Sequence, residues 1–528
     1  MTLPYFFVQG KTGICANTTI PQNVCQNSQQ TIDSATEAAN PLLQHDRACA
    51  MGIRSTRAEH LNEAIHFDFG IGYNWTVSAW PYITDTQNGT LLVVLPGRNL
   101  NFAWNGLTER YEGPRGFELT YDVYASQFTL KDPDGRIWQF VGFGKALTPK
   151  GRFFNLTAPN GETATVNGYT SYGHITRIVT RRRQGSSWAE ETWDYAYVSC
   201  DDGAERLQTF TIQSQVAGGS SENVRRYSYT YTIDGDLESV TESLYLDAQW
   251  VPQGVFYYRY AADGEPHRLQ YALHPEQFAA LSEDPEVSDP WQATDEQVAQ
   301  YATYYFEYDA NHRLSYRQPL AGGASWFSYT EGDATSTDPN VVHLQTVETR
   351  ADGSLRTSLT NYRNQPLVTE FKESANESTS SIDFYEYTED GQLALHATPS
   401  AMEDYQLSVE GGYTVEPTYR SENGQYNVGL IHVYDYYAET TTGTGGGAAT
   451  GFLQGEKIRK GRDGADITLR SLEYTEHSAE VPLEDVTWSS SSSSSSGPAT
   501  VELTIYPPAR ETHYRNDDGT GAIETESS

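Results

Sequence analysis

The stretch that decides the fold reads Tyr304-Tyr305-Phe306-Glu307-Tyr308-Asp309-Ala310-Asn311-His312-Arg313-Leu314. Its aromatic residues favour an extended strand, and the side chains of the Asp-Ala-Asn segment hydrogen-bond their own backbone and tolerate a reversal. Alternate residues of a strand share a face. Phe306 and Tyr308 are therefore expected on one face, and Tyr305 and Glu307 on the other. Together these residues predict a β-hairpin.

Several further segments repeat parts of this pattern. Three of them combine an aromatic strand, an Asp-Gly turn and a returning Leu, and they contain Asp234-Gly235, Asp263-Gly264 and Asp390-Gly391. Others keep only the turn and its flanks, at residues 128–138, 349–355 and 458–467. Asp-Gly pairs suit turns that need a positive φ. A series of such hairpins predicts a repeat architecture.

The segment Phe306-Glu307-Tyr308-Asp309-Ala310-Asn311-His312-Arg313-Leu314 resembles the YD repeat of rearrangement-hotspot (Rhs) and teneurin-type proteins. In that likeness the repeat-motif residues are Tyr305, Tyr308, Asp309, Arg313 and Leu314, together with the three Asp-Gly pairs. Residues 70–80 resemble the Gly-x-Gly opening of an Rhs core. The likeness covers roughly residues 67–396. It implies an all-β array of hairpins wound into a long curved or spiral sheet, which forms part of a shell.

The aromatic composition is consistent with a thin wall of strands. The 528 residues include 37 Tyr, 19 Phe and only 3 Met. A tyrosine ring can be buried while its hydroxyl reaches water or a partner. The row Tyr227, Tyr229, Tyr231 and Ile233 is predicted to share one face, and the neighbouring hairpin is expected to cover that face.

The charge of the chain excludes some partners. With 70 acidic and 35 basic residues the net charge is −35, so nucleic acid and anionic membranes would be repelled. The cluster Arg181-Arg182-Arg183 is interpreted as a solvated strand edge that discourages aggregation. No run of eighteen apolar residues predicts a membrane span.

The cysteines and the first residues bear on location. Cys15, Cys25, Cys49 and Cys200 are too few and too widely spaced for a disulfide framework or a zinc knuckle. A pairing among the first three is open if the protein is exported. Residues 1–30 have no secretory signal pattern. We expect an extracellular or cell-surface protein, whose true start lies upstream or which uses another export route.

Composition divides the chain into six parts. These are an irregular lead-in (1–66), a β segment that starts the shell (67–168), YD-like repeats (169–274), a helical insertion (275–303), further repeats and loops (304–480), and a Ser-rich linker with an acidic tail (481–528). The insertion is predicted to be helical and to lie on an outer face, because Thr294 and Gln297 have the capping-box spacing.

Two low-complexity segments interrupt the second half. Residues 440–451, rich in Gly and Thr, predict a flexible loop, and they lack the Lys of a phosphate-binding loop. The serine run at residues 489–496 predicts a linker. A last strand is expected at residues 499–506, whereas the acidic tail from residue 517 is not expected to fold.

No motif predicts catalysis, a metal or a cofactor. The spacing of His60, Glu63 and His66 turns the two imidazoles away from each other on a helix. There is no Gly-x-Ser-x-Gly elbow and no catalytic Cys signature. The remaining histidines are interpreted as surface or hairpin residues; these are His174, His267, His274, His312, His343, His396, His432 and His477.

Tryptophans raise the question of sugar binding. Burial in the core is the preferred interpretation over stacking on sugar rings for Trp75, Trp80, Trp138, Trp250, Trp291 and Trp326. A cell-surface glycan or protein is nevertheless a candidate ligand.

Three functional hypotheses follow. The leading one is a non-enzymatic Rhs/YD-repeat shell or surface-binding scaffold. The second is a truncated or split shell component of a polymorphic-toxin delivery system, whose partner is a separately encoded shell or toxin segment. The self-cleaving site and toxin domain of many such members are not seen after residue 467. The third is a carbohydrate-active hydrolase, which requires two acidic residues at a separation that the sequence does not specify.

Overall fold

The computed structural model describes residues 53–55 and most of residues 68–526. Not described within that range are residues 74, 78, 86–89, 96–97, 107–109, 114–116, 133–134, 145–149, 185–186, 201, 217–218, 262–266, 311–312, 364, 378, 410–411, 443–445, 483–499 and 516–519. The expected lead-in, apart from residues 53–55, and the serine run therefore lie outside the described residues.

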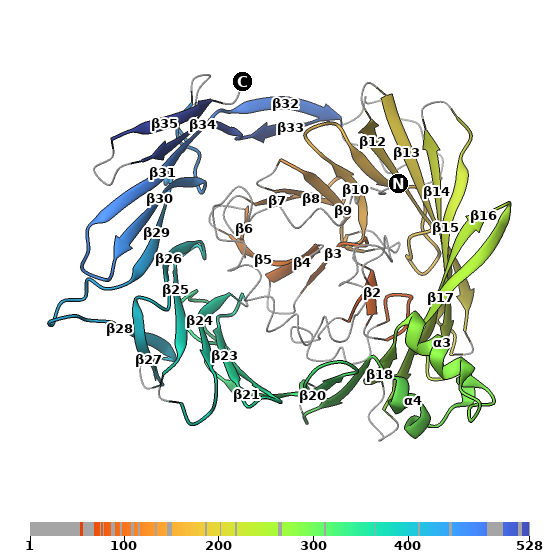
Figure 1. The fold of residues 1–528 in the computed structure, drawn as a ribbon. Coiled ribbons are helices and arrows are strands. Elements are labelled where there is room, and N and C mark those ends of the chain that lie inside the picture. The colour runs from red at the N-terminus through yellow and green to blue at the C-terminus, as the bar shows by residue number, and fades with distance from the viewer. Residues whose placement is uncertain are drawn as a thin grey trace.

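The described chain is nearly all β, and most of it belongs to one long antiparallel sheet. Twenty-nine strands pair in sequence order from β3 to β35. Three two-stranded sheets stand apart from it, namely β1 with β2, β27 with β28, and β32 with β33. The predicted fold class, a curved array of hairpins, is confirmed. Figure 1 shows the strands winding around a central group of N-terminal strands.

The strands of the N-terminal part are β1 (Ile53–Ser55), β2 (Trp75–Val77), β3 (Tyr82–Asp85), β4 (Thr90–Leu95), β5 (Arg98–Asn105), β6 (Arg110–Glu112), β7 (Glu118–Asp122), β8 (Gln127–Lys131), β9 (Ile137–Val141), β10 (Phe153–Thr157) and β11 (Thr163–Val166). The first part of the outer wall comprises β12 (Arg177–Gln184), β13 (Ser187–Ser199), β14 (Glu205–Val216), β15 (Glu222–Tyr231), β16 (Leu237–Leu246), β17 (Gln249–Tyr260) and β18 (Leu269–Leu273).

After the helices α3 (Pro275–Glu283), η4 (Pro290–Gln292) and α4 (Asp295–Tyr301), the wall continues with β19 (Tyr304–Tyr308), β20 (Leu314–Pro319), β21 (Ser325–Glu331), β22 (Leu344–Arg350), β23 (Leu355–Thr360), β24 (Pro366–Lys372), β25 (Ser381–Tyr387) and β26 (Leu393–Ala397). It ends with β29 (Leu430–Tyr436), β30 (Leu453–Lys460), β31 (Asp466–Tyr474), β34 (Pro508–Tyr514) and β35 (Ala522–Glu526). The separate hairpins between these strands are β27 (Met402–Ser408) with β28 (Thr414–Tyr419), and β32 (His477–Pro482) with β33 (Thr500–Ile505).

The first strands of the long sheet close on themselves. A β-bridge joins Tyr82 of β3 to Arg152, which precedes β10. Two hydrogen bonds flank the bridge, from Ile83 N to Gly151 O at 2.7 Å and from Phe153 N to Pro81 O at 3.2 Å. Strands β3 to β9 and the start of β10 thus form a small closed ring, which we call the inner ring. From β10 the sheet runs outward as an open wall.

The largest core cluster joins the inner ring to the wall. Phe102, Phe140 and Phe153 of the ring belong to the same cluster as Phe210 and Tyr227 of the wall. Trp80 packs edge-on against Tyr195 of β13, with ring centroids 5.2 Å apart. Because alternate residues of a strand face opposite ways, the wall has an inner face, the first part of which packs on the ring, and an outer face.

The helical insertion covers the outer face, as predicted. Phe278 and Leu281 of α3 and Val298 of α4 are buried against Tyr257 and Tyr271, which alternate with inner-face residues of β17 and β18. The predicted capping box is present, because Thr294 Oγ1 accepts from Gln297 N and Gln297 Oε1 accepts from Thr294 N. Neither α3 nor α4, in the part of the chain that is described, has the length and hydropathy of a membrane crossing.

Three local predictions were wrong in whole or in part. The Arg181-Arg182-Arg183 cluster lies in β12, where all three residues pair with β13 but only Arg181 also pairs with β11, so the cluster is only partly at a sheet edge. Arg181 stacks on Trp188, and Arg182 pairs with Glu191 at 3.3 Å. Ile233 leaves the tyrosine row because it lies in the turn after β15, where it is 92% exposed.

The third difference concerns the tail. Strand β35 extends through residues that were not expected to fold, and it pairs with β34. The ladder of backbone hydrogen bonds offered by β34 outweighs the acidic composition. The Gly-rich segment is also bonded across its base, from Thr441 N to Ala448 O at 2.9 Å. A backbone hydrogen bond across the base of this segment was not expected from the predicted flexible loop.

Candidate functional site

Tyrosine hydroxyls tie most hairpins of the wall to the preceding one. In β19, Tyr308 donates to the carbonyl of Leu269, 2.9 Å away, in the previous hairpin. In the next hairpin, Tyr329 of β21 donates to Leu314 O at 2.8 Å. We call this series the tyrosine ladder. Its members are Tyr169, Tyr197, Tyr231, Tyr260, Tyr308, Tyr329, Tyr387, Tyr436 and Tyr474.

A β-bulge accompanies most members of the ladder. The register shifts between Thr230 and Tyr231, between Glu307 and Tyr308, and at the corresponding place before Tyr197, Tyr260, Tyr387, Tyr436 and Tyr474. A bulge disrupts the backbone ladder locally. A buried carbonyl at such a place needs a donor, and the tyrosine of the following hairpin supplies it.

The first quoted hairpin has the predicted faces. Phe306 is 1% exposed on the inner face, while the outer-facing Tyr305 donates to Glu307 Oε1 at 2.9 Å. Leu314 is buried opposite Tyr308. Tyr305 therefore belongs to the repeat only in sequence, because its hydroxyl does not join the ladder.

Asp309 closes its own turn. Its carboxylate accepts from the backbone N of Arg313 at 2.8 Å and from Arg313 Nε at 2.9 Å. Thr232 and Thr388 take the same place in their hairpins, where each hydroxyl accepts from the backbone N four residues later. In these three hairpins the residue after the ladder tyrosine supplies a side-chain acceptor, and either Asp or Thr can provide it.

The Asp-Gly pairs lie further along the turn and have a different role. Gly235 and Gly391 have φ values of 86° and 80°, which favour glycine. Asp234 precedes the first of these glycines on the exposed side of its turn, and Asp390 precedes the second. Asp263 and Gly264 lie outside the described residues.

The Gly-x-Gly segment anchors the N-terminal part to the wall. We call residues 68–73 the anchor segment. Arg206 of β14 has a side chain that is 1% exposed, and it pairs with Asp68 at 2.7 Å and with Asp202 at 2.6 Å. Leu207 N donates to Gly70 O at 2.6 Å. Tyr73 stacks on His267 with ring centroids 3.8 Å apart.

Two glycines permit this close approach. Gly70 and Gly72 have φ values of 90° and 89°. A Cβ at Gly72 would be 2.7 Å from Leu237 N, and one at Gly70 would be 2.8 Å from the imidazole of His174. Both positions therefore require glycine for conformation and for space.

Burial perturbs the titrating groups around the anchor segment. A hydrogen bond of 2.8 Å joins Oδ1 of Asp236 to Nδ1 of His267. Burial, followed by the charge of Asp234, raises the pKa of Asp236 to about 7. Burial lowers the pKa of His267. Both shifts favour neutral forms, so the pair is held together with little net charge beside Arg206.

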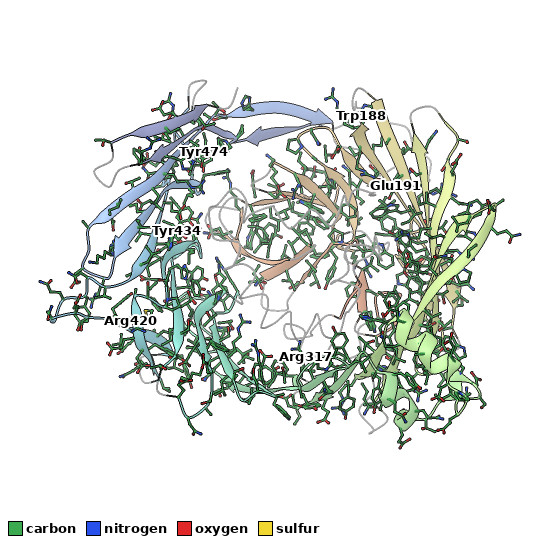
Figure 2. All side chains as sticks on the ribbon, in the orientation of Figure 1. Trp188, Glu191, Arg317, Arg420, Tyr434 and Tyr474 are labelled. Carbon is green, nitrogen blue, oxygen red and sulfur yellow. The ribbon has the colours of Figure 1, made fainter. Side chains whose placement is uncertain are left out.

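A row of charged and polar side chains continues on the inner face beyond β19. We call it the concave polar row; it comprises Arg317, Glu348, Asp383, His396, His432, Glu456, Arg470 and Glu511. Neighbouring members are paired, for example His396 with Asp383 at 2.7 Å and Arg470 with Glu456 at 3.3 Å. Figure 2 marks this side of the wall at Arg317 on β20, Tyr434 on β29 and Tyr474 on β31.

Two other groups of predictions have mixed outcomes. His396, interpreted as a surface or hairpin residue, lies in the β25–β26 hairpin opposite Tyr385 and is 8% exposed, so it is a hairpin residue but not a surface one. It stacks on Tyr385 with centroids 4.6 Å apart, and neighbouring strands cover it. Trp75, Trp80 and Trp138 are buried, as expected, whereas Trp291 and Trp326 are 38% and 47% exposed. His312 lies outside the described residues.

No chemical centre emerges from the described residues. Among them, no group of three or more His, Cys, Asp and Glu side chains is placed to hold a metal ion. His60, Glu63 and His66 lie outside the described residues, as do Cys15, Cys25 and Cys49. Cys200 is a free cysteine. The features that distinguish this chain are therefore the tyrosine ladder, the anchor segment and the concave polar row.

No protein-family model matches the sequence, and no curated protein matches it. Solved structures with some likeness include a Tc holotoxin pore of Photorhabdus luminescens with a TccC3 mutation (11% identity, 72% of this chain, 19% of that chain, TM-score 0.29). A TcdB2–TccC3 complex (10%, 84%, 27%, 0.19) and a porin-like protein from Bacteroides uniformis (9%, 65%, 96%, 0.17) are others.

The chain spans about a fifth to a quarter of the length of the Tc chains that it matches. TM-scores this low carry no argument for a shared fold or activity.

Proposed function

We propose that this chain is a non-enzymatic shell scaffold of the Rhs/YD-repeat type. The observation that carries the proposal is the unbranched strand order from β3 to β35, wound outward from a closed inner ring. The tyrosine ladder adds a bond between successive hairpins. A wall built in this way gains stability from neighbour-to-neighbour contacts, which suits a structural role better than a role in turnover.

We further propose that the wall is one part of a toxin-associated assembly in an extracellular or cell-surface setting. Its partner is a separately encoded shell or toxin segment. The concave polar row supports this partner class. A polar inner face can enclose another chain without burying that chain in a shared hydrophobic core. The members of the row are largely paired with one another, which leaves them compatible with water.

Electron microscopy of the purified full chain tests the scaffold. A curved wall around central density is the expected image, whereas a string of separate globules would contradict it. Co-expression with an adjacent reading frame tests the partner. The encoded segment is expected to co-purify and to resist protease only when the wall is present. Exposure of that segment to protease in the complex would contradict enclosure and leave the wall itself unaffected.

No observation on the described residues favours a carbohydrate-active hydrolase. Replacing single concave carboxylates, for example Glu456→Gln and Asp383→Asn, separates the alternatives. A scaffold retains its assembly behaviour in both variants. Loss of glycan turnover with unchanged folding would instead establish the hydrolase.

A further inference from the structure

An uninterrupted row of aromatic rings lies on the outer face beside the helical insertion. Tyr271 and Tyr305 have ring centroids 5.1 Å apart, Tyr305 and Tyr316 are 6.0 Å apart, and Tyr316 and Trp326 are 5.4 Å apart. These residues come from β18, β19, β20 and β21 in turn. We call them the outer aromatic row.

The row emerges from beneath the helices into solvent. Tyr271 is 8% exposed and belongs to the cluster under α3 and α4, whereas Trp326 is 47% exposed. Tyr305 and Tyr316 lie between them and are half-buried. An exposed tryptophan at the end of an ordered aromatic row marks a binding surface better than an isolated exposed ring does.

The surroundings of the row are acidic. Glu307 is exposed on the outer face and accepts the Tyr305 hydroxyl at 2.9 Å. Asp295 and Glu296 of α4 are exposed near the buried end. The charges of Asp295 and Glu296 add to burial in raising the pKa of Tyr271. A cationic ligand would therefore meet both ring faces and carboxylates, which attract it by different means.

One arginine of the chain already illustrates this mode of binding. Arg259 lies over the ring of Tyr257, 5.7 Å from its centroid. Its guanidinium donates to the Tyr257 hydroxyl at 2.8 Å and to Asp295 Oδ1 at 2.9 Å. The same combination of tyrosine and carboxylate recurs at Tyr305 and Glu307, further along the row.

We propose that the outer aromatic row is a docking surface for a basic protein segment that carries arginine or lysine side chains. The cations lie over Tyr316 and Trp326 and pair with Glu307. The net charge of −35 speeds the approach of such a segment and disfavours anionic ligands. This surface is on the opposite side of the wall from the concave polar row, so the inference goes beyond the scaffold role and does not depend on it.

A fluorescently labelled peptide of alternating Arg and Gly tests the proposal by anisotropy with the full chain at about 0.15 M salt. Trp326→Ala and Glu307→Gln are each expected to weaken binding, the first by about tenfold. Trp326→Phe keeps an aromatic face and is expected to retain most of the affinity. It also preserves the test if the alanine variant fails to fold.

Matched controls separate this surface from general attraction to an acidic protein. Trp188→Ala removes another exposed tryptophan, and Glu403→Gln removes another exposed carboxylate; both are expected to change the affinity less than twofold, within the scatter of surface substitutions. Equal loss in all four variants would overturn the proposal, as would no binding at all. Binding of a neutral oligosaccharide but not of the basic peptide would assign the row to a glycan instead.

Discussion

Each ladder tyrosine connects two hairpins through a single hydroxyl group. Tyr308→Phe removes the donor to Leu269 O and leaves the aromatic ring in place. An unsatisfied buried carbonyl costs about 1–3 kcal/mol, so we expect a loss of that size in the free energy of unfolding, measured by urea titration. Tyr305→Phe, in the same strand, is the control. Its hydroxyl donates to the side chain of the exposed Glu307 and not to a main-chain carbonyl of the preceding hairpin, and an equal loss there would contradict the ladder.

The anchor segment depends on one buried cation. Arg206→Met leaves Asp68 and Asp202 without their partner, and breaking a buried pair from one side costs about 3–5 kcal/mol. Arg177→Met is the control, since Arg177 pairs with Asp194 while 51% exposed. Exposed pairs contribute at most about 1 kcal/mol. Equal unfolding midpoints for the two variants would show that the anchor adds little.

Asp236 predicts a pH dependence of stability. Its pKa of about 7 in the folded chain compares with about 3.9 in an unfolded one. Between these values the folded chain holds a proton that the unfolded chain releases. The contribution of Asp236 is therefore fully present below about pH 4 and is lost as the pH rises towards 7.

In Asp236→Asn that contribution no longer varies with pH. The difference in unfolding free energy between the two proteins should change by about 2 kcal/mol from about pH 5 to about pH 7.5. Asp234→Asn, at an exposed neighbour that only adds repulsion, should produce a smaller change. The lowered pKa of His267 acts in the opposite direction, and the charge of Asp234, which raises that pKa, is absent only from Asp234→Asn. A constant difference across this range would refute the assignment.

For single residues, the sequence predicted which face of a strand a side chain occupies, but it did not predict the contacts of the anchor segment. Alternation placed Phe306 and Tyr308 on one face correctly, because a strand has a period of two. Arg206 had no such signal. Its partner Asp68 is 138 residues away in sequence, and no local spacing reports a contact of that range.

Among the elements, the turns differ in how closely the wall surrounds them. Gly235 and Gly353 both have positive φ, 86° and 85°. A Cβ at Gly353 would meet nothing within 4 Å, whereas one at Gly235 would be 2.3 Å from Arg206 Nη2. Gly353→Ala should cost about 1–2 kcal/mol from conformation alone.

Gly235→Ala should cost about 1–3 kcal/mol more than that, because it also overpacks a filled site. Thermal or urea unfolding of both variants measures the difference. Equal destabilisation would mean that Arg206 moves aside without loss.

Elements were predictable where the signal was local. The capping box at Thr294 and Gln297 located a helix because both partners lie within one turn. The Arg181-Arg182-Arg183 cluster was only partly at an edge, because the pairing of β12 depends on where β11 begins rather than on the residues of β12 itself. The burial of His396 likewise comes from neighbouring strands. Strand alternation predicted that Ile233 continues the row of Tyr227, Tyr229 and Tyr231, but Ile233 lies in the exposed turn after β15.

For the whole molecule, the wall has two separate main cores. One joins the inner ring to β13–β17, where strands reach 13 and 12 residues. The other lies around β25–β31 and includes strands of 7 and 5 residues. Longer strands packed on the ring should open last. We expect hydrogen exchange at increasing urea to expose amides of β25–β26 before those of β13–β14. Simultaneous exchange would indicate a single cooperative unit.

The stacking of hairpins into one wall was predictable, because the motif recurs along the chain. The closure of the inner ring was not. It depends on a bridge between Tyr82 and Arg152, and no repeat motif predicts that bridge. The pairing of β35 was equally unpredictable, because its acidic composition suggested an unfolded tail, whereas its backbone pairs with β34.

The acceptor in the tyrosine ladder is a main-chain oxygen, which every amino acid possesses. The residue that supplies it can therefore change without removing the bond; Pro366 already takes the place that leucine holds elsewhere. Only the donor and the bulge that presents the acceptor must be kept. The surface residues of such a wall can therefore be substituted to suit different partners while the hydrogen bonds between its hairpins are kept.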